Sequence, residues 1–415
     1  MDVVMSPLCA SEHNPHYGLE VYASVEDVVE FAGADEPMHV LFPDALERAA
    51  HSFLDHFHGD VLYAVKCNPH EQVLSYLSRF GVRHFDVASI AEIDGVLDIA
   101  PDAHLYYMHP VKSRHAIRYA YGRGVRDFAI DCMAELSKIL EETSNARDLN
   151  LYVRLAQPKG SAAYDLSGKF GCRGEEAVEL LQVARRHCDK LAVSFHVGSQ
   201  CMSPSSYAAA IKVARSLVDV AGVDVDILDV GGGFPVDYPG MTPPPVSAFL
   251  DAIHQAVVDC GWQDVELKCE PGRAMVADSG SLLVKVEMRR GDKLYINDGT
   301  YGSLYDAGSI GWRYPTRKVG GDNSAHDCAY SFYGPTCDSH DYMEGPFHLP
   351  SNIDEGQWIE VGMMGAYGAA MRTQFNGFKG DHMVLVTTTP EMLNTADDTL
   401  VAFEGVMDEG HDNDR

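Results

Sequence analysis

The sequence predicts an α/β protein in which a (β/α)8, TIM-like barrel is joined to a mostly antiparallel β domain. Short apolar runs alternate with amphipathic segments from about residue 44 to residue 278. These runs number eight, and their span agrees with the roughly 250 residues typical of such a barrel. After about residue 279, β-prone segments follow one another without a comparable set of helices. We therefore expect a barrel over 44–278 and a β-sandwich or β-barrel domain from 1–43 and 279–415.

The predicted barrel strands are continuous apolar runs rich in Val, Ile, Leu, Phe and Tyr. Such runs are typical of parallel strands that are buried on both faces. The segments between them, such as Glu71–Arg79 and Glu175–Arg186, place apolar residues at helical spacing. The eight predicted strands are Val61–Lys66, Val82–Asp86, His104–Met108, Asp127–Asp131, Leu151–Leu155, Leu191–His196, Val225–Val230 and Val265–Glu270.

The predicted strands of the second domain are joined by Gly- and Pro-rich connections. Near the N-terminus, Met38–Phe42 could add a strand to this domain, and the acidic tail Asp408–Arg415 is expected to fray. The other predicted strands are Ser281–Met288, Lys293–Asn297, Ala329–Tyr333, Trp358–Val361 and His382–Thr387.

Composition excludes several classes of function. Lys and Arg total 32 against 61 Asp and Glu, a net charge of -29, so phosphate backbones and anionic lipid surfaces are repelled. We expect no nucleic-acid partner and no membrane, since no apolar run reaches the roughly 18 residues of a spanning helix. The ten cysteines form no C-x-x-C pair, and no secretory signal pattern precedes them, which favours a reduced cytoplasmic protein with no bound metal.

Polar residues and glycines stand at the carboxyl ends of seven of the eight predicted strands. In a parallel barrel these ends form the reactive face. For Asp131 taken alone, a helix cap or a rim charge is the better interpretation. Seven such positions that converge on one mouth nevertheless predict a functional site. They are Lys66, Asp86, Asp131, Arg154, His196, Gly231–Gly233 and Glu270.

The residue types at this mouth suit a phosphorylated, cationic ring. Burial at the end of an apolar strand should depress the pKa of Lys66 and give a neutral, nucleophilic amine, although the side chain could instead extend to solvent. Gly231–Gly233 allow a close backbone approach to an anion, unless they form only a tight turn. Glu270 can keep a ring nitrogen protonated, and His196 can lie flat against a ring. Together these groups describe a pyridoxal phosphate site.

Five motifs, in this order, resemble those of the fold type III, or alanine-racemase-fold, amino acid decarboxylases. The resemblance runs from about Leu19 to about Phe378. The motifs are Tyr63-Ala-Val-Lys-Cys-Asn68, Phe85-Asp-Val-Ala-Ser89 with Glu92, Phe195-His-Val-Gly-Ser199, Asp229-Val-Gly-Gly-Gly-Phe-Pro235 and Glu270-Pro-Gly-Arg273. Further motifs are similar to those of ornithine decarboxylases, namely Leu166-Ser-Gly-Lys-Phe-Gly171, Asn297-Asp-Gly-Thr-Tyr-Gly-Ser303, Gly334-Pro-Thr-Cys-Asp338 and Gly365-Ala-Tyr367.

The resemblance implies pyridoxal 5'-phosphate as cofactor and a carboxy-lyase that makes putrescine from L-ornithine for polyamine biosynthesis. Lys66 would carry the cofactor covalently, His196 would stack on its ring, and Glu270 would pair with the ring nitrogen. The remaining cofactor-binding residues would be Asp86, Arg154, Ser199, Gly231, Gly232, Gly233, Gly272, Arg273 and Tyr367.

The resemblance also implies a homodimer with shared active sites, in which Cys337 and Asp338 reach the site from the partner subunit. A thiol such as Cys337 is a reasonable acid for protonating the product, although a free cysteine is often a buried structural residue. Asp338 would bind the distal ammonium group of the substrate, and Tyr301 and Asp306 are further candidates for substrate binding. The register of Asp306 is open, because the segment before it is shorter than the usual one.

The substrate and three alternatives stay open at this point. Ornithine and lysine differ by one methylene, which is worth only about 1 to 3 kcal/mol of discrimination in a pocket. The segment His196-Val-Gly-Ser-Gln200 has Gln200 where many ornithine decarboxylases have glycine, and in this it also resembles diaminopimelate and lysine/ornithine decarboxylases. A diaminopimelate decarboxylase should carry additional arginine, whereas Gly334–Asp341 is acidic. An alanine racemase should have arginine in place of Glu270. An inactive binding homologue, similar to the antizyme inhibitors, is disfavoured because Lys66 and Cys337 are present.

Overall fold

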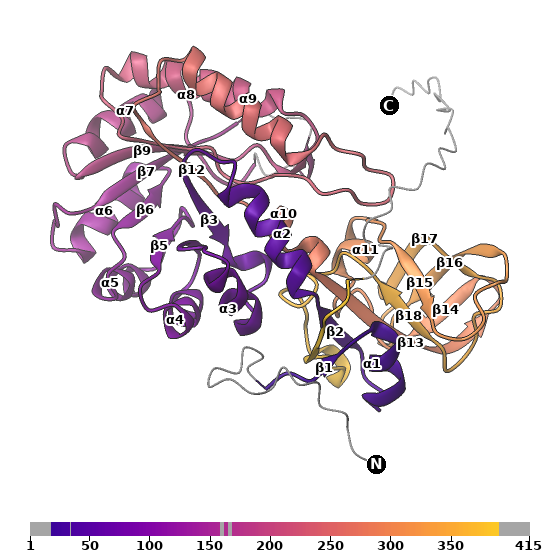
Figure 1. Ribbon diagram of the computed structural model, residues 1–415. Helices are drawn as coiled ribbons and strands as arrows, with labels where there is room; N and C mark the ends of the chain where they lie inside the picture. The colour runs from indigo at the N-terminus through magenta and orange to yellow at the C-terminus, as the bar shows by residue number, and fades with distance from the viewer. Residues whose placement is uncertain (1–17, 34, 158–161, 165–167, 390–415) are drawn as a thin grey trace, which may run out of the picture.

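The computed structural model divides into a barrel and a β domain (Figure 1), and it describes residues 18–33, 35–157, 162–164 and 168–389. Eight parallel strands close the barrel in the order β11-β12-β3-β4-β5-β6-β7-β9. Each predicted barrel strand is present, so the predicted fold class is confirmed. The strands are β3 (Asp60–Ala64), β4 (His84–Val87), β5 (His104–Tyr107), β6 (Asp127–Ile130), β7 (Asn150–Leu155), β9 (Lys190–Phe195), β11 (Ile227–Asp229) and β12 (Glu266–Cys269).

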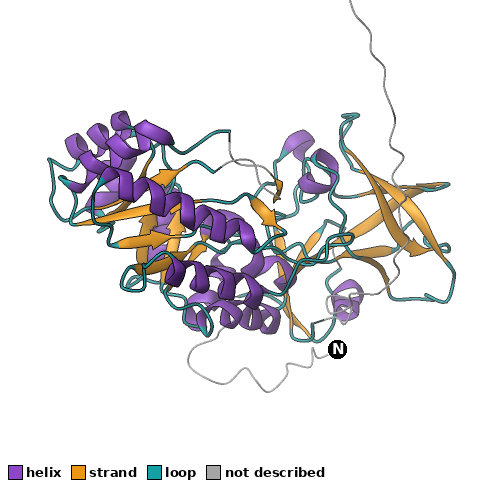
Figure 2. Ribbon diagram, turned by 90° about the horizontal axis from the view of Figure 1, so that it is seen from above, coloured by secondary structure: helices purple, strands orange, loops and turns teal. Residues whose placement is uncertain are grey.

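Helices follow the barrel strands and cover their outer face, as Figure 2 shows from above. Serine side chains cap the N-termini of two of these helices. Ser89 accepts a hydrogen bond from the N–H of Glu92, and Ser113 accepts one from the N–H of Ala116. The helices are α2 (Pro43–Leu54), α3 (Glu71–Arg79), α4 (Ile90–Ile99), α5 (Arg114–Gly122), α6 (Met133–Glu142), α7 (Gly174–Arg185), α8 (Ser205–Ala221), α9 (Val246–Asp259) and the short α10 (Arg273–Val276).

The inside of the barrel has an apolar middle between two polar ends. Alternate residues of each strand point inward. The buried cluster in the middle consists of Leu62, Tyr106, Met108, Ala129, Tyr152, Ala192 and Ile227. The charged side chain of Lys268 on β12 is also buried next to this cluster, with its Nζ 5.4 Å from the ring centre of Tyr106. The carboxyl ends of the strands therefore form a polar mouth above an almost entirely apolar layer.

The second domain is a nine-stranded sheet in which β13 is the central strand. β13 pairs antiparallel with β2, β14 and β18, whereas β19 pairs parallel with β1 and β2. The strand expected at Met38–Phe42 is thus present as β2, and it lies between two strands from the other end of the chain. The strands are β1 (Val21–Tyr22), β2 (Met38–Leu41), β13 (Gly280–Arg290), β14 (Lys293–Ile296), β15 (Thr316–Val319), β16 (Asp327–Tyr333), β17 (Tyr342–Pro350), β18 (Trp358–Val361) and β19 (His382–Val386).

Several smaller elements were not expected. They are the helices α1 (Val25–Phe31) and α11 (Tyr305–Ser309), the strands β1, β15 and β17, and a pair formed by β8 (Ala162–Tyr164) and β10 (Ser199–Cys201). The tail Asp408–Arg415 and the first two residues of the motif at 166–171 lie outside the described residues. The domain boundaries at 43/44 and 278/279 stay a prediction. Within the described part of the chain, no helix combines the length and the apolar character of a membrane span.

Candidate active site

Lys66 lies at the barrel mouth, in the turn η1 (Val65–Cys67) that follows β3. Its Nζ donates to Oδ2 of Asp86 at 2.8 Å. The Lys66 side chain is 46% exposed whereas that of Asp86 is 3% exposed, so the amine can be reached from the mouth while its partner cannot. Burial lowers the pKa of Lys66, but the charges of Asp86 and Glu270 outweigh it, and the net pKa is raised. The expectation of a depressed pKa is therefore wrong, because it omitted the acid on the neighbouring strand.

His196 follows β9 and presents an uncharged ring to the mouth. Its Nδ1 accepts a hydrogen bond from the N–H of Gly198 at 3.0 Å, which leaves the ring proton on Nε2. Burial, followed by the charges of Arg154 and Lys66, holds the pKa of His196 well below its usual range. A neutral, fixed imidazole is suited to lying against an aromatic ring, as the sequence predicts.

Glu270 follows β12 and lies next to a second buried acid, Asp229, at the end of β11. Burial raises the pKa of both carboxyls, and the interaction between the two lowers the pKa of Asp229 and raises that of Glu270. Oδ1 of Asp229 accepts from the N–H of Gly231 at 2.8 Å, and Oδ2 is buried without a donor of fixed position among the described residues. Two adjacent buried acids share a proton unless a cation faces them. This pair is therefore suited to a cationic ring nitrogen.

The glycines of the mouth have no room for side chains. An added Cβ at Gly231 would lie 2.0 Å from the carbonyl oxygen of Phe195, and one at Gly232 would lie 2.4 Å from that of Glu270. Gly231 and Gly233 also have φ values of +67° and +100°, which favour glycine. At Gly272 the Cβ would lie 2.3 Å from Sγ of Cys67. Bare backbone at two neighbouring strand ends forms a cradle of the kind that binds phosphate.

Arg273 provides the cation of this cradle. Its Nη1 donates to the hydroxyl of Tyr238 at 3.2 Å, and its Nη2 lies 3.5 Å from Oδ2 of Asp306. The guanidinium lies 4.1 Å from the ring centre of Trp312 and 4.8 Å from that of Tyr367. Within the described residues its buried Nε has no acceptor, so one N–H donor is available to an anion.

The mouth therefore fits pyridoxal phosphate on three structural grounds. It offers an amine that can be reached, an unsatisfied pair of buried acids, and a cradle with an unpaired guanidinium N–H. Tyr367 borders this cradle with a φ of +64°, and its N–H donates to the carbonyl oxygen of Cys67 at 2.8 Å. Ser199 begins β10, directly after Gly198, whose carbonyl oxygen would lie 2.2 Å from a Cβ added at Gly233. Asp131, in contrast, accepts from the N–H of Gly171 at 3.0 Å, in agreement with the structural role preferred for it.

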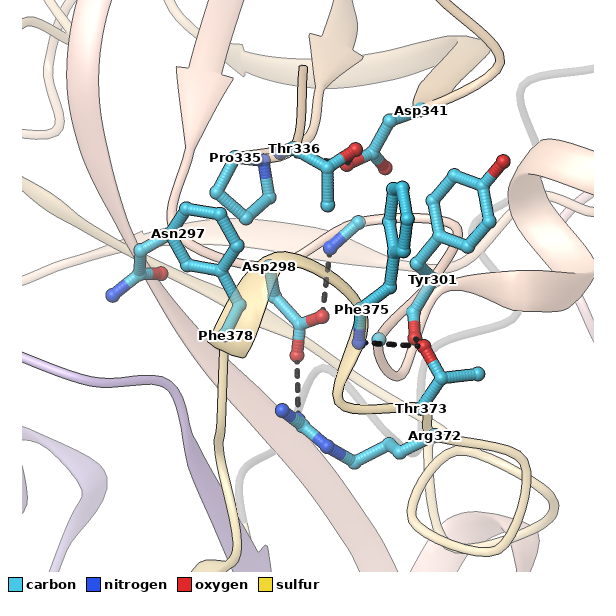
Figure 3. Close-up of a pocket in the computed structure, with 12 residues that line it drawn as sticks. Asn297, Asp298, Tyr301, Pro335, Thr336, Asp341, Arg372, Thr373, Phe375 and Phe378 are labelled. Atoms are coloured by element: carbon cyan, nitrogen blue, oxygen red, sulfur yellow. Dashed lines mark hydrogen bonds and ion pairs between the residues drawn. The ribbon is translucent and has the colours of Figure 1, made fainter. Parts of the chain in front are cut away.

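Cys337, Asp338 and Tyr301 form a second group in the β domain. The hydroxyl of Tyr301 donates to Oδ2 of Asp338 at 3.0 Å, and the exposed Cys337 has its Sγ 3.4 Å from Oδ1 of Asn376. Figure 3 shows Tyr301 beside Phe375 in the small pocket at this place. Within the described part of the chain, no hydrogen bond or ion pair joins this group to Lys66. The roles of Cys337 and Asp338 stay a prediction.

Buried Asp341 fixes the turn that carries Cys337 and Asp338. It accepts from the N–H of Thr300 at 2.8 Å, and from the N–H and hydroxyl of Thr336 at 3.0 and 2.7 Å. Figure 3 shows Asp341 next to Thr336 at the rim of the pocket. The sequence analysis did not single out Asp341, nor did it assign roles to Asp229 and Trp312. Asp229 could have been found, because it stands in the glycine motif one strand away from Glu270.

Comparison with known proteins identifies the class of protein. Residues 44–277 match the family model described as pyridoxal-dependent decarboxylase, pyridoxal binding domain. The chain belongs to the pyridoxal-dependent decarboxylase family, and it is a fold type III carboxy-lyase with pyridoxal phosphate as cofactor. The predicted family and cofactor are thereby confirmed.

The named relatives are decarboxylases and, in one case, an antizyme inhibitor. The chain is 34% identical over 349 residues to an ornithine decarboxylase of Schizosaccharomyces pombe, with 79% of this chain and 77% of the relative covered. It is 33% identical over 341 residues to a lysine/ornithine decarboxylase of Selenomonas ruminantium, with 80% and 84% covered. An antizyme inhibitor 2 of Xenopus laevis is 32% identical over 350 residues, with 76% and 73% covered.

Solved structures show the same fold. A lysine decarboxylase from Selenomonas ruminantium has a TM-score of 0.77 and 30% identity, with 90% of this chain and 98% of that chain covered. A lysine/ornithine decarboxylase from Vibrio vulnificus complexed with putrescine has a TM-score of 0.75 and 29% identity, with 88% and 100% covered. An arginine decarboxylase of Paramecium bursaria Chlorella virus, bound to agmatine, has a TM-score of 0.77 and 27% identity, with 86% and 98% covered.

Proposed function

We propose that this decarboxylase acts on L-ornithine to give putrescine, with L-lysine as a second substrate that gives cadaverine. The observation that carries this proposal is the mouth itself, where an amine, an acid pair and a phosphate cradle face one another. The named relatives support the substrate class, since they include ornithine and lysine/ornithine decarboxylases. Both amino acids carry a second ammonium group, which suits an acidic rather than an arginine-rich pocket.

The residues of the mouth have separate tasks in this proposal. Lys66 would hold the cofactor covalently, and Asp86, whose Oδ2 lies 2.8 Å from Nζ, is placed to accept the proton that the ammonium group must lose. Glu270 holds the proton on the ring nitrogen, and neutral His196 supports the flat face of the ring. When bound, pyridoxal phosphate supplies the electron sink that takes up the electron pair left as carbon dioxide departs. The phosphate would be held by Ser199, Gly231, Gly232, Gly233, Gly272, Arg273 and Tyr367, and Arg154 would lie beside the amine.

The substrate-binding and proton-donating groups are assigned to the partner subunit. Sγ of Cys337 of the partner subunit holds the proton that is delivered to the substrate carbon. Asp338 of the partner subunit binds the distal ammonium group, with its carboxylate oriented by a tyrosine hydroxyl as in the contact of Tyr301 with Asp338 at 3.0 Å. This assignment makes a homodimer with shared sites the active unit. The exposed aromatic residues Phe375 and Phe378 near Cys337 are suited to burial in such an interface.

Asp306 is the substrate-binding candidate with the weaker geometric support. Its side chain is 12% exposed and lies against Arg273, so its charge is already partly used in the phosphate cradle. A cytoplasmic location is proposed as well. Nine cysteines in the described part of the chain are unpaired, as expected in a reducing compartment.

The proposal is tested by measuring released carbon dioxide and amine product with ornithine, lysine, arginine and diaminopimelate. Ornithine should give the highest kcat/KM, followed by lysine. Faster turnover of arginine or diaminopimelate would refute the proposed substrate. A protein that binds no pyridoxal phosphate and releases no carbon dioxide would favour the alternative of an inactive binding protein. The similarity to an antizyme inhibitor is the observation behind this alternative.

Shared sites are tested by mixing two inactive variants. Lys66→Ala lacks the amine of one subunit and Cys337→Ala lacks the thiol of the other. Mixed dimers contain one site with both residues intact, so about a quarter of the wild-type activity should return when the subunits exchange freely. No recovery in dimers shown to have exchanged would mean that each chain contains its complete site.

A further inference from the structure

A buried lysine below the acid pair has no role in the mechanism described so far. Lys268 lies on β12, two residues before Glu270, so both side chains point into the barrel. It is 3% exposed and stands in the otherwise apolar middle layer. A buried ammonium is costly unless opposite charges face it.

The neighbours of Lys268 are acids on both sides. In the parallel pairing its Cα is opposite Asp60 of β3 and Asp229 of β11. Its Nζ lies 2.5 Å from Oδ2 of Asp60 and 3.5 Å from the hydroxyl of Tyr106. The ammonium therefore lies between the lower end of the barrel and the acid pair at its mouth.

The ammonium of Lys268 lowers the pKa of Asp60, but Asp60 has other stabilising partners, whereas Lys268 is the cation that acts on Asp229 among the described residues. The Asp60 side chain is 41% exposed and also faces His84 at 3.5 Å, so water and the histidine can stabilise its charge. Asp229 is fully buried, and its Oδ2 lacks a donor of fixed position among the described residues. Burial raises the pKa of Asp229, while its hydrogen bonds with Glu270 and the N–H of Gly231, and then the positive charge of Lys268, lower it.

We propose that Lys268 is a positioning residue, whose ammonium is the counter-charge that lets the Asp229–Glu270 pair face the cofactor ring as an anion. The inference rests on the proposed role of Glu270 at the ring nitrogen. Without Lys268 the pair would keep its shared proton to higher pH, and an acid pair that is neutral holds a cationic ring less well. Lys268 is 3% exposed, so in this proposal it acts through Asp229 and Glu270 and not by contact with the cofactor or substrate.

The other charged groups inside the barrel have partners besides the acid pair. Above the pair, Lys66 is bound to Asp86, while Arg154 lies over the ring of Phe170 at 5.7 Å. At the lower end, His104 binds Asp127 at 2.8 Å, and Tyr152 donates to the same acid at 2.9 Å. On the remaining sides, His84 contacts the hydroxyl of Tyr106 at 2.9 Å, and Glu266 pairs with Lys190 while its Oε2 also lies 3.9 Å from Nζ of Lys268. A substitution of Lys268 therefore removes a charge near the acid pair without breaking a contact of the mouth.

The experiment compares Lys268→Met with Asp60→Asn. The dissociation constant of pyridoxal phosphate is measured from pH 6 to pH 9, together with kcat. In Lys268→Met the pH midpoint of cofactor binding should move about one unit to higher pH, which weakens binding about tenfold below the wild-type midpoint. In Asp60→Asn the full ammonium charge acts on Asp229, so the midpoint should move to lower pH.

Opposite shifts distinguish a charge effect from general damage to the barrel. A Lys268→Met profile that superimposes on the wild type, or two shifts in the same direction, would overturn the proposal. In a Glu270→Gln background, Lys268→Met should cause no further shift, and an undiminished shift would overturn it too. If Lys268→Met does not fold, the direction of the pH shift in Asp60→Asn still decides, since a midpoint that does not move to lower pH would overturn the proposal. A wild type that binds no cofactor at any pH would instead refute the proposed function.

Discussion

The turn that carries Cys337 and Asp338 depends on one buried carboxylate, which Asp341→Asn would remove. Asp341 is 3% exposed and accepts three hydrogen bonds, two of them from backbone N–H groups. Asparagine can place its single oxygen toward only one side of this arrangement, and its amide group then faces another donor. At least one buried N–H is left without an acceptor.

The cost follows from the number and kind of these bonds. An unsatisfied buried donor costs about 1 to 3 kcal/mol, and the loss of a charge-assisted hydrogen bond costs a similar amount. We expect Asp341→Asn to lose about 2 to 5 kcal/mol, which corresponds to a fall in Tm of roughly 5 to 15 °C for a domain of this size. The decarboxylation rate should fall as well, since Cys337 and Asp338 would no longer be held in place.

The assay is thermal unfolding followed by circular dichroism, with kcat and KM measured at a temperature where both proteins are folded. Asp327→Asn, at an exposed carboxylate on β16, is the matched control and should change stability by no more than about 0.5 kcal/mol. If Asp341→Asn unfolds within 1 °C of the wild type and keeps its kcat, the turn is held by something other than this carboxylate.

Four further substitutions test the mouth, the substrate group and the β domain. Lys66→Met should abolish turnover and borohydride-dependent labelling with pyridoxal phosphate while leaving a folded dimer, and turnover at the wild-type rate would contradict the assignment. Gly232→Ala should weaken cofactor binding at least tenfold, since its Cβ would lie 2.4 Å from the carbonyl oxygen of Glu270; unchanged affinity would show that the backbone yields. Asp338→Asn should raise KM for ornithine about tenfold or more with little change in cofactor affinity, and an equal KM would remove it from substrate binding. Burial lowers the pKa of His39 to about 3. Because the unfolded chain takes up the proton at a higher pH, the wild type should lose stability as the pH falls below about 6.5. His39→Gln should reduce this loss of stability, and parallel stability–pH profiles of the two proteins would refute the role of His39.

The barrel was predictable because its strands are buried on both faces. Continuous apolar runs located all eight strands, and the helix predicted at Glu71–Arg79 has these same bounds in the structure. The mouth was predictable as well, because the parallel strands of a barrel bring their carboxyl ends together. The strand β17 was missed, because Glu344, Gly345, Pro346 and His348 interrupt its apolar pattern.

The charge state of the mouth could not be predicted from spacing along the chain. Whether burial or a neighbouring acid decides the pKa of Lys66 depends on the 2.8 Å contact with Asp86 on the next strand. The same holds for Lys268, which in the sequence is a polar residue within a short apolar run. Its place between Asp60 and Asp229 follows from the register of three strands, which the sequence does not specify.

The pairing of β2 with β13 has a consequence for how the chain folds as it is synthesised. Leu41 is opposite Gly280, so the whole barrel is translated between the two halves of this ladder. When residues 38–41 leave the ribosome, they stay unpaired with β13 until the barrel has been synthesised. A chaperone that shields this short apolar segment, or early folding of the barrel that keeps it near the exit tunnel, would protect the nascent chain from pairing with the wrong neighbour.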